Sequence, residues 1–319
     1  MDSVYHIPAM LKETIDGLNI KSDGVYVDVT FGGGGHSRAI LDRMGELEDS
    51  KIQRFQNSKL KIKNCGHLYS FDQDKDALRN AIEDERWTFV HSNFRYLRNW
   101  MDYYGVESID GLLADLGVSF HHFDCPERGF SFRFSAPLDM RMNQTAKRTA
   151  ADIVNGYSEE ELAKIFYLYG ELKNGRGIAK NICRARIQKP IERTEDLVAA
   201  SRIPAEMSKE LARLFQALRI EVNDEMGALR EMLVAARDLL KPGGRIAILT
   251  YHSLEDRLVK NFLRSGNLEG TIEKDFYGNN LSPFTLIEKG REASAEEVER
   301  NPRSRSAKLR VAEKLRIKN

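Results

Sequence analysis

Cysteine is scarce in this sequence, and that scarcity excludes one class of protein. The three cysteines, Cys65, Cys125 and Cys183, are odd in number and lie far apart. A disulfide framework is therefore not expected, and reduced thiols in a cytoplasmic protein are the expectation. Residues 1–8 contain no basic stretch followed by an apolar one, so we expect no signal peptide.

Long apolar runs and an excess of one charge are also missing. No stretch is apolar over the length that a membrane span requires, so we expect no membrane partner. The net charge is +1, and any basic surface for a nucleic acid must therefore be local. With 319 residues and 41% hydrophobic residues, the chain can form a sizeable core in two domains, or in one domain with a large insert.

The most informative feature that is present is a run of glycines from Gly32 to Gly35. It follows a strand-like segment, residues 25–28, and precedes a helix-like segment, residues 36–44. A strand, a glycine turn and a helix form the first half of a nucleotide-type binding unit. Glycine is needed there because only a backbone without Cβ bends sharply and lies close against a ligand.

Further strand-like segments follow at 67–72, 87–91 and 109–115, and a helix-like segment follows the first of them at 74–82. Strands that alternate with helices predict an α/β fold with a parallel sheet covered on both faces. Ligands of such sheets bind beyond the carboxyl ends of the strands, which is where Asp28, Asp72 and Asp115 fall. The last three strands are expected at 245–251, 285–289 and 307–314.

The strand signal is weak between the fourth and fifth predicted strands, where several helices are expected. Ser158 and Glu161 form a capping box ahead of apolar residues at helical spacing, and Thr194 is expected to cap another helix. We therefore expect a helical insert at 121–215 within a core domain made of residues 1–120 and 216–319.

Two more segments have a predicted local structure. Asn223 or Asp224 is expected to cap a long helix. The charged and polar segment 44–66 is expected to be a solvated helix or a surface loop.

The carboxylate of Asp72 is predicted to accept hydrogen bonds from the ribose hydroxyls of a cofactor. A helix N-cap is the alternative role, and both roles can hold together. The glycine run lacks the Lys-Ser/Thr of a phosphate-binding loop and does not match G-x-G-x-x-G. This favours a ligand with a ribose and an adenine but no phosphate, and S-adenosylmethionine fits that description.

Asp115 and His252 are the candidates for chemistry at the same edge of the sheet. A carboxylate at Asp115 would hold the methionine amino group or accept a hydrogen bond from a substrate amine, while a strand-end turn residue is the alternative. His252 comes just after the fifth strand. The more common meaning of that motif is a helix N-cap, here expected at Ser253 with Asp256 as its partner.

Two other groups of residues carry weaker signals. Adjacent His121 and His122 with Cys125 do not give a recognised zinc spacing, so we expect no metal. Basic residues between 128 and 148 interleave with phenylalanines. The arginines either contact phosphates and stack on unpaired bases or face water. The phenylalanines are expected to anchor the insert to the core. Arg303 and Arg305, flanked by serines in a loop, are candidates for phosphate contact.

Seven motifs together resemble the bacterial ribosomal RNA small subunit methyltransferase H family, also called MraW. They occur in the order of the family and span nearly the whole chain. These motifs are TFGGGGHS (30–37), DLGVS (115–119), ERGFSF (127–132), PLDMRM (137–142), FQALRIEVN (215–223), YHSLEDR (251–257) and NPRSRS (301–306).

The resemblance implies a Rossmann-like class I S-adenosylmethionine-dependent methyltransferase fold. It implies methylation of the N4 amine of a cytidine in the decoding region of 16S ribosomal RNA, in the 30S subunit. His122 stands where the family usually has a glutamine, and the segment 44–66 is longer than is usual in the family. The cofactor contacts that the matching motifs imply are Gly34, Gly35, His36, Asp72, Phe94, Asp115 and His122.

The chemistry of such a transfer mainly requires alignment of the attacking nitrogen with the methyl–sulfur axis. Cytosine's exocyclic nitrogen is a poor nucleophile, so an acceptor for its N–H would help as charge builds. Asp115 is the first candidate for that acceptor, backbone carbonyls near Gly117 are others, and His252 is a weaker one. The Pro-Pro-aromatic signature common in N4-aminomethyltransferases is absent. The target base must be unstacked, and the insert is the expected wall for RNA.

Two other classes of protein remain open. One is another enzyme on the same fold, such as a DNA or protein methyltransferase or a nicotinamide oxidoreductase. The other is a non-catalytic RNA-binding or assembly factor. The sequence does not fix the oligomeric state, and a homodimer stays open.

Overall fold

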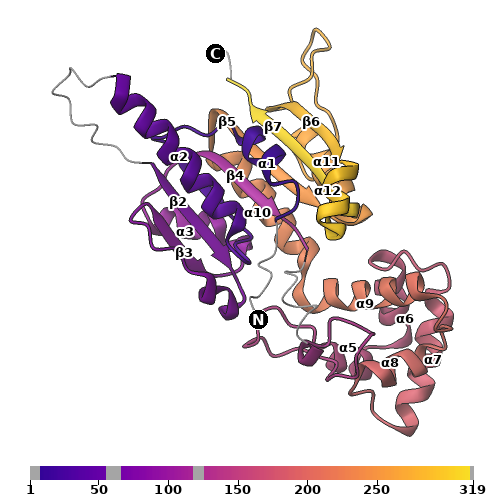
Figure 1. The fold of residues 1–319 in the computed structure, drawn as a ribbon. Coiled ribbons are helices and arrows are strands. Elements are labelled where there is room, and N and C mark those ends of the chain that lie inside the picture. The colour runs from indigo at the N-terminus through magenta and orange to yellow at the C-terminus, as the bar shows by residue number, and fades with distance from the viewer. Residues whose placement is uncertain (1–7, 55–65, 118–125, 317–319) are drawn as a thin grey trace. The chain divides into compact units, whose positions relative to one another are not determined.

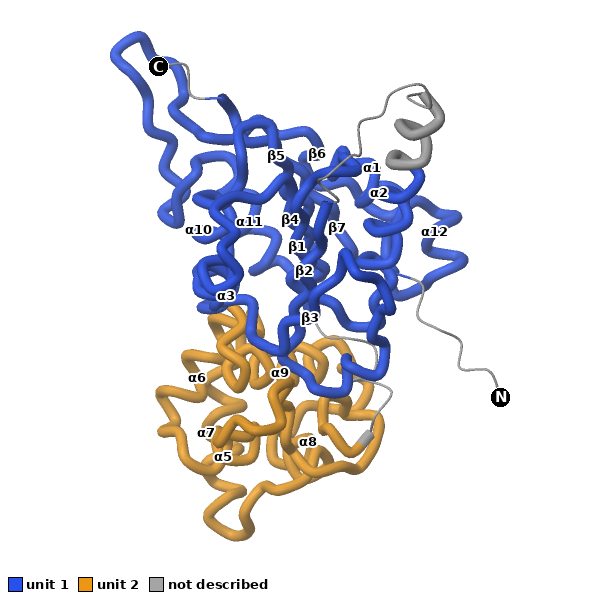
Figure 2. The backbone as a smooth tube through the Cα atoms, turned by 90° about the vertical axis from the view of Figure 1, so that its left-hand side faces the viewer, with its two compact units in different colours: residues 1–117, 227–319 blue, residues 118–226 orange. Residues whose placement is uncertain are grey.

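The computed structural model describes residues 8–54, 66–117 and 126–316 (Figure 1). The chain divides into two compact units, drawn in different colours in Figure 2. Unit 1 contains Met1–Gly117 and Gly227–Asn319, and unit 2 is Val118–Met226. Helix α9, Ser208–Asn223, crosses position 215, where the sequence placed the end of the insert. The compact unit instead ends at Met226, in the first turn of α10 (Glu225–Leu239).

Unit 1 is built on a seven-stranded sheet in the order β3-β2-β1-β4-β5-β7-β6. Figure 2 shows this sheet edge-on, with α3, α10 and α11 on one side and α1, α2 and α12 on the other, which confirms the expected α/β fold. The strands are β1 (Val25–Asp28), β2 (His67–Asp72), β3 (Trp87–His91), β4 (Ile109–Asp115), β5 (Leu240–Thr250), β6 (Phe284–Glu292) and β7 (Lys308–Lys314). The elements that flank them are α1 (Leu11–Leu18), α2 (Gly35–Arg54), η1 (Lys75–Asn80), η2 (Phe94–Tyr96), α3 (Leu97–Tyr103), α10 (Glu225–Leu239), α11 (Ser253–Ser265), α12 (Ala295–Arg300) and η4 (Pro302–Ser306).

The strands β1 to β5 pair in parallel, and β7 is antiparallel to both β5 and β6. The expected parallel sheet is therefore correct except at β7. Strand β6 ends and β7 begins at the same end of the sheet, with Glu292 opposite Lys308. The connection between them therefore needs no crossover, and neighbouring strands connected in that way pair antiparallel. The buried residues Tyr26, Val27, Leu112 and Leu113 lie in the central strands β1 and β4, which explains their nearly continuous apolar composition.

The helices of unit 2 surround a hydrophobic core of their own, which includes Leu162, Phe166, Ile178, Ile182 and Leu214. The predicted capping box is confirmed, because Ser158 Oγ accepts from Glu161 N at 3.2 Å and the Glu161 carboxylate accepts from Ser158 N at 2.7 Å. The elements of this unit are η3 (Pro126–Arg128), α5 (Ala150–Gly156), α6 (Glu159–Leu168), α7 (Gly175–Gln188), α8 (Thr194–Ser201) and α9.

The cap predicted at Thr194 is wrong, and of the two alternatives for the next long helix, Asn223 is not its cap, whereas Asp224 stands directly before its first residue, Glu225. Thr194 is the first residue of α8, and its hydroxyl donates to Phe134 O at 2.6 Å instead of capping the helix. Asn223 ends α9, and its side-chain oxygen accepts from Met142 N at 2.8 Å. Asp224, with φ of 45°, separates α9 from α10. For Thr194 and Asn223, a residue distant in sequence binds the side-chain group that the local pattern assigned to a cap.

Two predicted segments differ from the structure in kind or extent. The helix expected at 74–82 is the short 3-10 helix η1, which ends because Ala81 has extended backbone angles. Helix α2 continues to Arg54, so the first part of the segment 44–66 is helical. Residues 55–65 lie outside the described residues.

Candidate functional site at the carboxyl edge of the sheet

The glycine run lies between β1 and α2 and adopts a backbone that only glycine readily takes. Gly32 and Gly34 have φ of 50° and 75°. A Cβ on Gly34 would stand 2.9 Å from the Phe31 ring, and one on Gly35 would stand 2.6 Å from Pro8. The loop therefore has no room for side chains at Gly34 and Gly35, whereas Gly32 and Gly33 have no side chain packed against them at the carboxyl end of β1.

Asp72, at the end of β2, is fastened to this loop. Its Oδ2 accepts from Gly32 N at 2.9 Å, and its Oδ1 accepts from Asp74 N at 2.8 Å. The predicted helix-cap role belongs instead to Asp74, whose Oδ1 accepts from Asp76 N at 3.0 Å. A carboxylate has about four acceptor positions, so Asp72 can also accept from a ligand hydroxyl.

Two further side chains brace the same loop, and sequence reasoning missed both. Asn80 Nδ2 donates to Gly32 O at 3.1 Å, and Arg38 Nη1 donates to Gly33 O at 2.8 Å. Arg38 Nη2 also donates to Asn80 O at 2.7 Å. Arg38 lies in the first turns of the helix that follows the glycines, and this closeness in sequence was its only signal.

Asp28 and Ser37 form a buried polar core beneath the loop. Ser37 Oγ donates to Asp28 Oδ2 at 2.6 Å and lies 2.8 Å from Ser70 Oγ. Asp28 Oδ1 also accepts from Thr30 N at 3.0 Å. Burial raises the pKa of Asp28 above its ordinary value. These bonds fix the start of α2 against β1 and β2.

His36 is buried, with 5% of its surface exposed. Its Nε2 lies 3.2 Å from Ala9 O, and its Nδ1 lies 3.7 Å from Asp115 Oδ2. Burial lowers the pKa of His36, so its ring is neutral at pH 7. The structure thus brings together His36 and Asp115, two predicted site residues from distant motifs.

Asp115, at the end of β4, lies among groups from three elements. Its Oδ1 accepts from the Tyr251 hydroxyl at 2.7 Å, and its backbone N donates to Thr30 Oγ1 at 2.6 Å. Burial raises the pKa of Asp115 to about 7, although the Tyr251 hydrogen bond opposes this rise. A carboxyl with such a pKa exchanges a proton readily near neutral pH, as a general base must.

Tyr251 is the site residue that sequence analysis did not single out, although its motif was noted for His252. Its pKa is raised well above the ordinary value, first by burial and then by Asp115, so its hydroxyl remains a donor. Tyr251 N donates to Glu255 Oε2 at 3.0 Å, which ties the end of β5 to helix α11.

His252 is the N-cap of α11, and the prediction of Ser253 as the cap is wrong. The His252 Nδ1 accepts from Glu255 N at 3.5 Å, and its Nε2 lies 3.1 Å from Glu255 Oε1. Ser253 is the first residue of the helix itself. Both ring nitrogens of His252 thus lie against its own helix, which weakens the case for a role in chemistry.

Phe94 is the first residue of η2 and is half-buried just beyond the end of β3. The preceding Asn93 caps η2 and donates to Gln73 Oε1 at 2.8 Å, so the loops after β2 and β3 are joined. His122, the remaining predicted cofactor contact, lies outside the described residues, as do His121 and Cys125.

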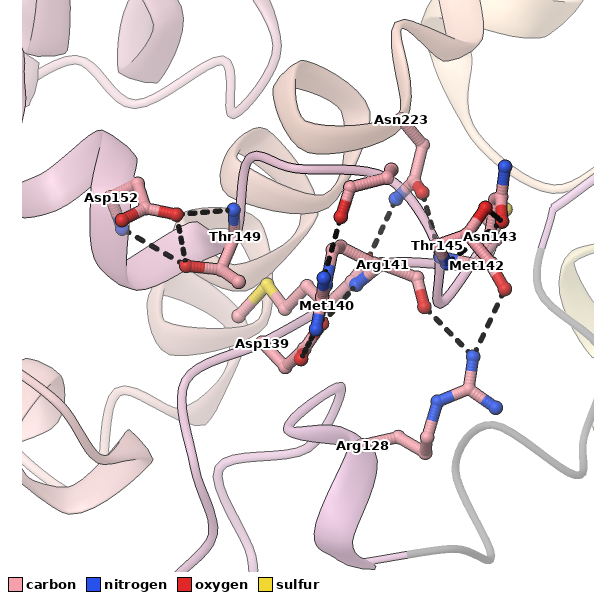
Figure 3. A network of polar contacts seen from close by, with 11 residues as sticks. Arg128, Asp139, Met140, Arg141, Met142, Asn143, Thr145, Thr149, Asp152 and Asn223 are labelled. Atoms are coloured by element: carbon pink, nitrogen blue, oxygen red, sulfur yellow. Dashed lines mark hydrogen bonds and ion pairs between the residues drawn. The ribbon is translucent and has the colours of Figure 1, made fainter.

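Two of the arginines near the start of unit 2, Arg128 and Arg141, have structural partners (Figure 3). Arg133 and Arg148 are exposed. Arg128 Nη2 donates to the carbonyls of Arg141 and Met142 at 2.8 and 3.1 Å. Arg141 makes a two-point ion pair with Asp139, at 2.7 and 2.6 Å. These bonds hold the segment that Asn223 also clamps, through Met142 N and Met140 O.

The phenylalanines of the same segment pack within unit 2. Phe130 is buried in the core of that unit, and Phe132 packs edge-on against Phe215 at 5.6 Å. Phe134 is 49% exposed. The prediction that they anchor the insert to the α/β core is therefore wrong, because two of them complete the core of the insert itself.

Arg303 and Arg305 lie on the 3-10 helix η4 instead of in a loop, and both are exposed. Their phosphate contact stays a prediction. No helix of the described residues is long and apolar enough to cross a membrane.

Comparison with known proteins places the chain among methyltransferases. A family model described as the MraW methylase family matches residues 3–315. "Ribosomal RNA small subunit methyltransferase H" of Parabacteroides distasonis is 57% identical over 319 aligned residues, covering 98% of this chain and 99% of the relative. The protein of that name from Phocaeicola vulgatus is 56% identical over 315 residues, covering 98% of both chains. An rRNA methylase structure from Streptococcus thermophilus aligns with a TM-score of 0.41 at 14% identity, covering 98% of this chain and 100% of the other.

Proposed function

This chain belongs to the MraW methylase family, and on that premise we propose that it methylates the N4 amine of a cytidine in the decoding region of 16S ribosomal RNA. The coarser statement, methylation of small-subunit ribosomal RNA, follows from relatives that are more than half identical over nearly the whole chain. The methyl donor is S-adenosylmethionine, and the assembled 30S subunit is the proposed substrate. The cytoplasm, where ribosomal RNA is found, is the proposed location.

The residues at the carboxyl edge of the sheet fit this cofactor. The glycine loop is open at Gly32 and Gly33, and the Asp72 carboxylate faces that loop. We propose that Asp72 accepts from the ribose hydroxyls, that Phe94 packs against the cofactor, and that His36 supports the loop beside Asp115. The role of His122 as a replacement for the usual glutamine is part of the same proposal.

The observation that carries the proposed chemistry is the 2.7 Å hydrogen bond that the Tyr251 hydroxyl donates to the Asp115 carboxylate. The bound cofactor supplies an electrophilic methyl group on a sulfonium. The ionised Asp115 would accept a hydrogen bond from the N4–H of cytosine and take the proton that N4 releases as the nitrogen–carbon bond forms and the carbon–sulfur bond breaks. The protein otherwise aligns the two reactants.

The decisive experiment is radiolabelled methyl transfer to 30S subunits that lack the modification, with the modified nucleotide mapped. We expect stoichiometric incorporation at N4 of one cytidine. No incorporation by a folded protein that binds S-adenosylmethionine would favour a non-catalytic RNA-binding factor.

Calorimetry with S-adenosylmethionine and with NAD separates the cofactors, and binding of NAD alone would overturn the proposal. The same assay with naked 16S RNA tests whether the free RNA is also a substrate. Sedimentation of the protein tests whether it forms a homodimer.

Tyr251→Phe is expected to move the pH dependence of methyl transfer to higher pH by about one unit. The Tyr251 hydroxyl lowers the pKa of Asp115 by donating to its charged form. A hydrogen bond to a charged group contributes about 1.5–3 kcal/mol, and one pKa unit corresponds to about 1.4 kcal/mol. Single-turnover rates between pH 5.5 and 9 measure the midpoint. An unchanged midpoint would show that Asp115 does not control the rate.

A further inference from the structure

Helix α7 of unit 2 carries a row of cations on one face. Arg176, Lys180 and Arg184 are spaced four residues apart, and all three are exposed. Residues that are four positions apart lie on the same side of a helix. The helix, Gly175–Gln188, contains no aspartate or glutamate. This face therefore carries positive charge with no acid of its own helix to balance it.

The packing of α7 fixes which way these cations point. Ile178, Ala179 and Ile182 are buried in the core of the unit, so the other side of the helix faces outward. Cations elsewhere on this segment have structural partners: Arg186 Nη1 donates to Val154 O at 2.7 Å, and Lys189 pairs with Asp196 at 3.0 Å.

The three outward cations, in contrast, have no ion-pair partner among the residues that the structure describes. Glu159 and Glu160, in the first turn of α6, act electrostatically on Cys183 of α7, so these two acids lie close to this helix. The row thus keeps its charge available for an external anion.

The spacing of the row suits a chain of anions better than a single one. A helix rises about 1.5 Å per residue, so successive cations stand about 6 Å apart along the axis. Each long side chain can then reach a different phosphate of one nucleic-acid strand. A single small anion would need the cations to converge, and a fixed helical row does not converge.

We propose that Arg176, Lys180 and Arg184 bind the phosphate backbone of the substrate RNA. The inference rests on the proposed function for the identity of that RNA. Contacts to phosphates carry no sequence information, so this face positions the RNA while the site in unit 1 selects the base. An acidic protein surface is the competing partner, and the experiment below separates the two.

The test is the triple variant Arg176→Gln, Lys180→Gln, Arg184→Gln, with Lys12→Gln, Lys260→Gln, Lys274→Gln as the control. The control removes three exposed lysines from unit 1 and thus the same total charge. Filter binding measures affinity for a 16S RNA fragment against salt concentration, and steady-state kinetics measures KM and kcat on 30S subunits. Calorimetry with S-adenosylmethionine and thermal unfolding confirm that both variants are folded.

We expect the α7 variant to bind the RNA fragment about tenfold more weakly near physiological salt, with KM raised to a similar extent and kcat unchanged. The slope of log affinity against log salt should fall by about 2, because each single-strand phosphate contact contributes about 0.7. Glu159→Gln with Glu160→Gln should act in the opposite direction and tighten binding.

Equal losses in both triple variants would overturn the proposal, since bulk charge would then suffice. Unchanged RNA affinity with a raised KM on 30S subunits would assign the face to a protein partner instead. The RNA-binding measurement does not depend on methyl transfer. An inactive wild type would therefore refute the proposed function, while the filter-binding comparison would still test whether the α7 cations bind RNA.

Discussion

Asp115→Asn is expected to lower the rate of methyl transfer about 10²–10³-fold. Asparagine keeps the shape of the side chain and an oxygen that accepts from the Tyr251 hydroxyl, but it cannot take a proton. Single-turnover methyl transfer at saturating S-adenosylmethionine measures this loss. Calorimetry measures the cofactor affinity separately, because Asp115 is also a proposed cofactor contact.

The pH dependence gives a second readout of the same carboxyl. Burial raises the pKa of Asp115 to about 7, so the wild-type rate should rise about tenfold per pH unit below 7 and level off above it. Only the ionised carboxylate accepts the hydrogen bond and the proton. The Asn variant should show no inflection near pH 7. A variant with wild-type rates at every pH would remove Asp115 from the chemistry.

The stability of the Asp115→Asn variant serves as a control on its fold. The folded-state pKa of Asp115 lies above the unfolded value of about 3.9, so the folded protein binds more protons between these values. Stability from this group therefore falls as the pH rises from about 4 to 7. Asparagine cannot ionise, so the variant should melt at or above the wild-type temperature at pH 8. Loss of activity in a variant that melts early would point to misfolding.

Asp72→Ala is expected to weaken S-adenosylmethionine binding about 10–100-fold without unfolding the protein. The carboxylate accepts from Gly32 N and Asp74 N, and we propose that it also accepts from the ribose hydroxyls. Removal of an acceptor from groups that it pairs costs about 1–3 kcal/mol. Titration calorimetry gives the affinity directly, and unchanged affinity would remove Asp72 from the site.

Two matched variants separate the roles of this side chain. Asp76→Ala changes a neighbouring acid that pairs with the exposed Arg79 at 3.2 Å, so the cofactor affinity of this variant should stay near wild type. Asp72→Asn retains one oxygen to accept from Gly32 N but loses the negative charge. Full recovery of affinity in this variant would mean that Asp72 only supports the loop, whereas partial recovery would support a direct contact with the ribose.

Local sequence was sufficient where local interactions decide the structure. The bounds of β1, β2, β3 and β4 agree with the prediction, since each strand is a short run of apolar and β-branched residues between turn residues. The capping box at Ser158 depends only on residues three positions apart. The glycine loop could be predicted from the sequence because its backbone conformation disfavours residues that carry a Cβ.

Tertiary structure alone decided which side chains meet. Tyr251 and Asp115 are 136 positions apart, and Tyr251 reaches the carboxylate only because β4 and β5 are neighbours in the sheet. The caps expected at Thr194 and Asn223 failed because partners distant in sequence bind those side chains. A sequence motif specifies which chemical groups are available, whereas the order of strands and the packing of helices set the distances that determine their pKa values and partners.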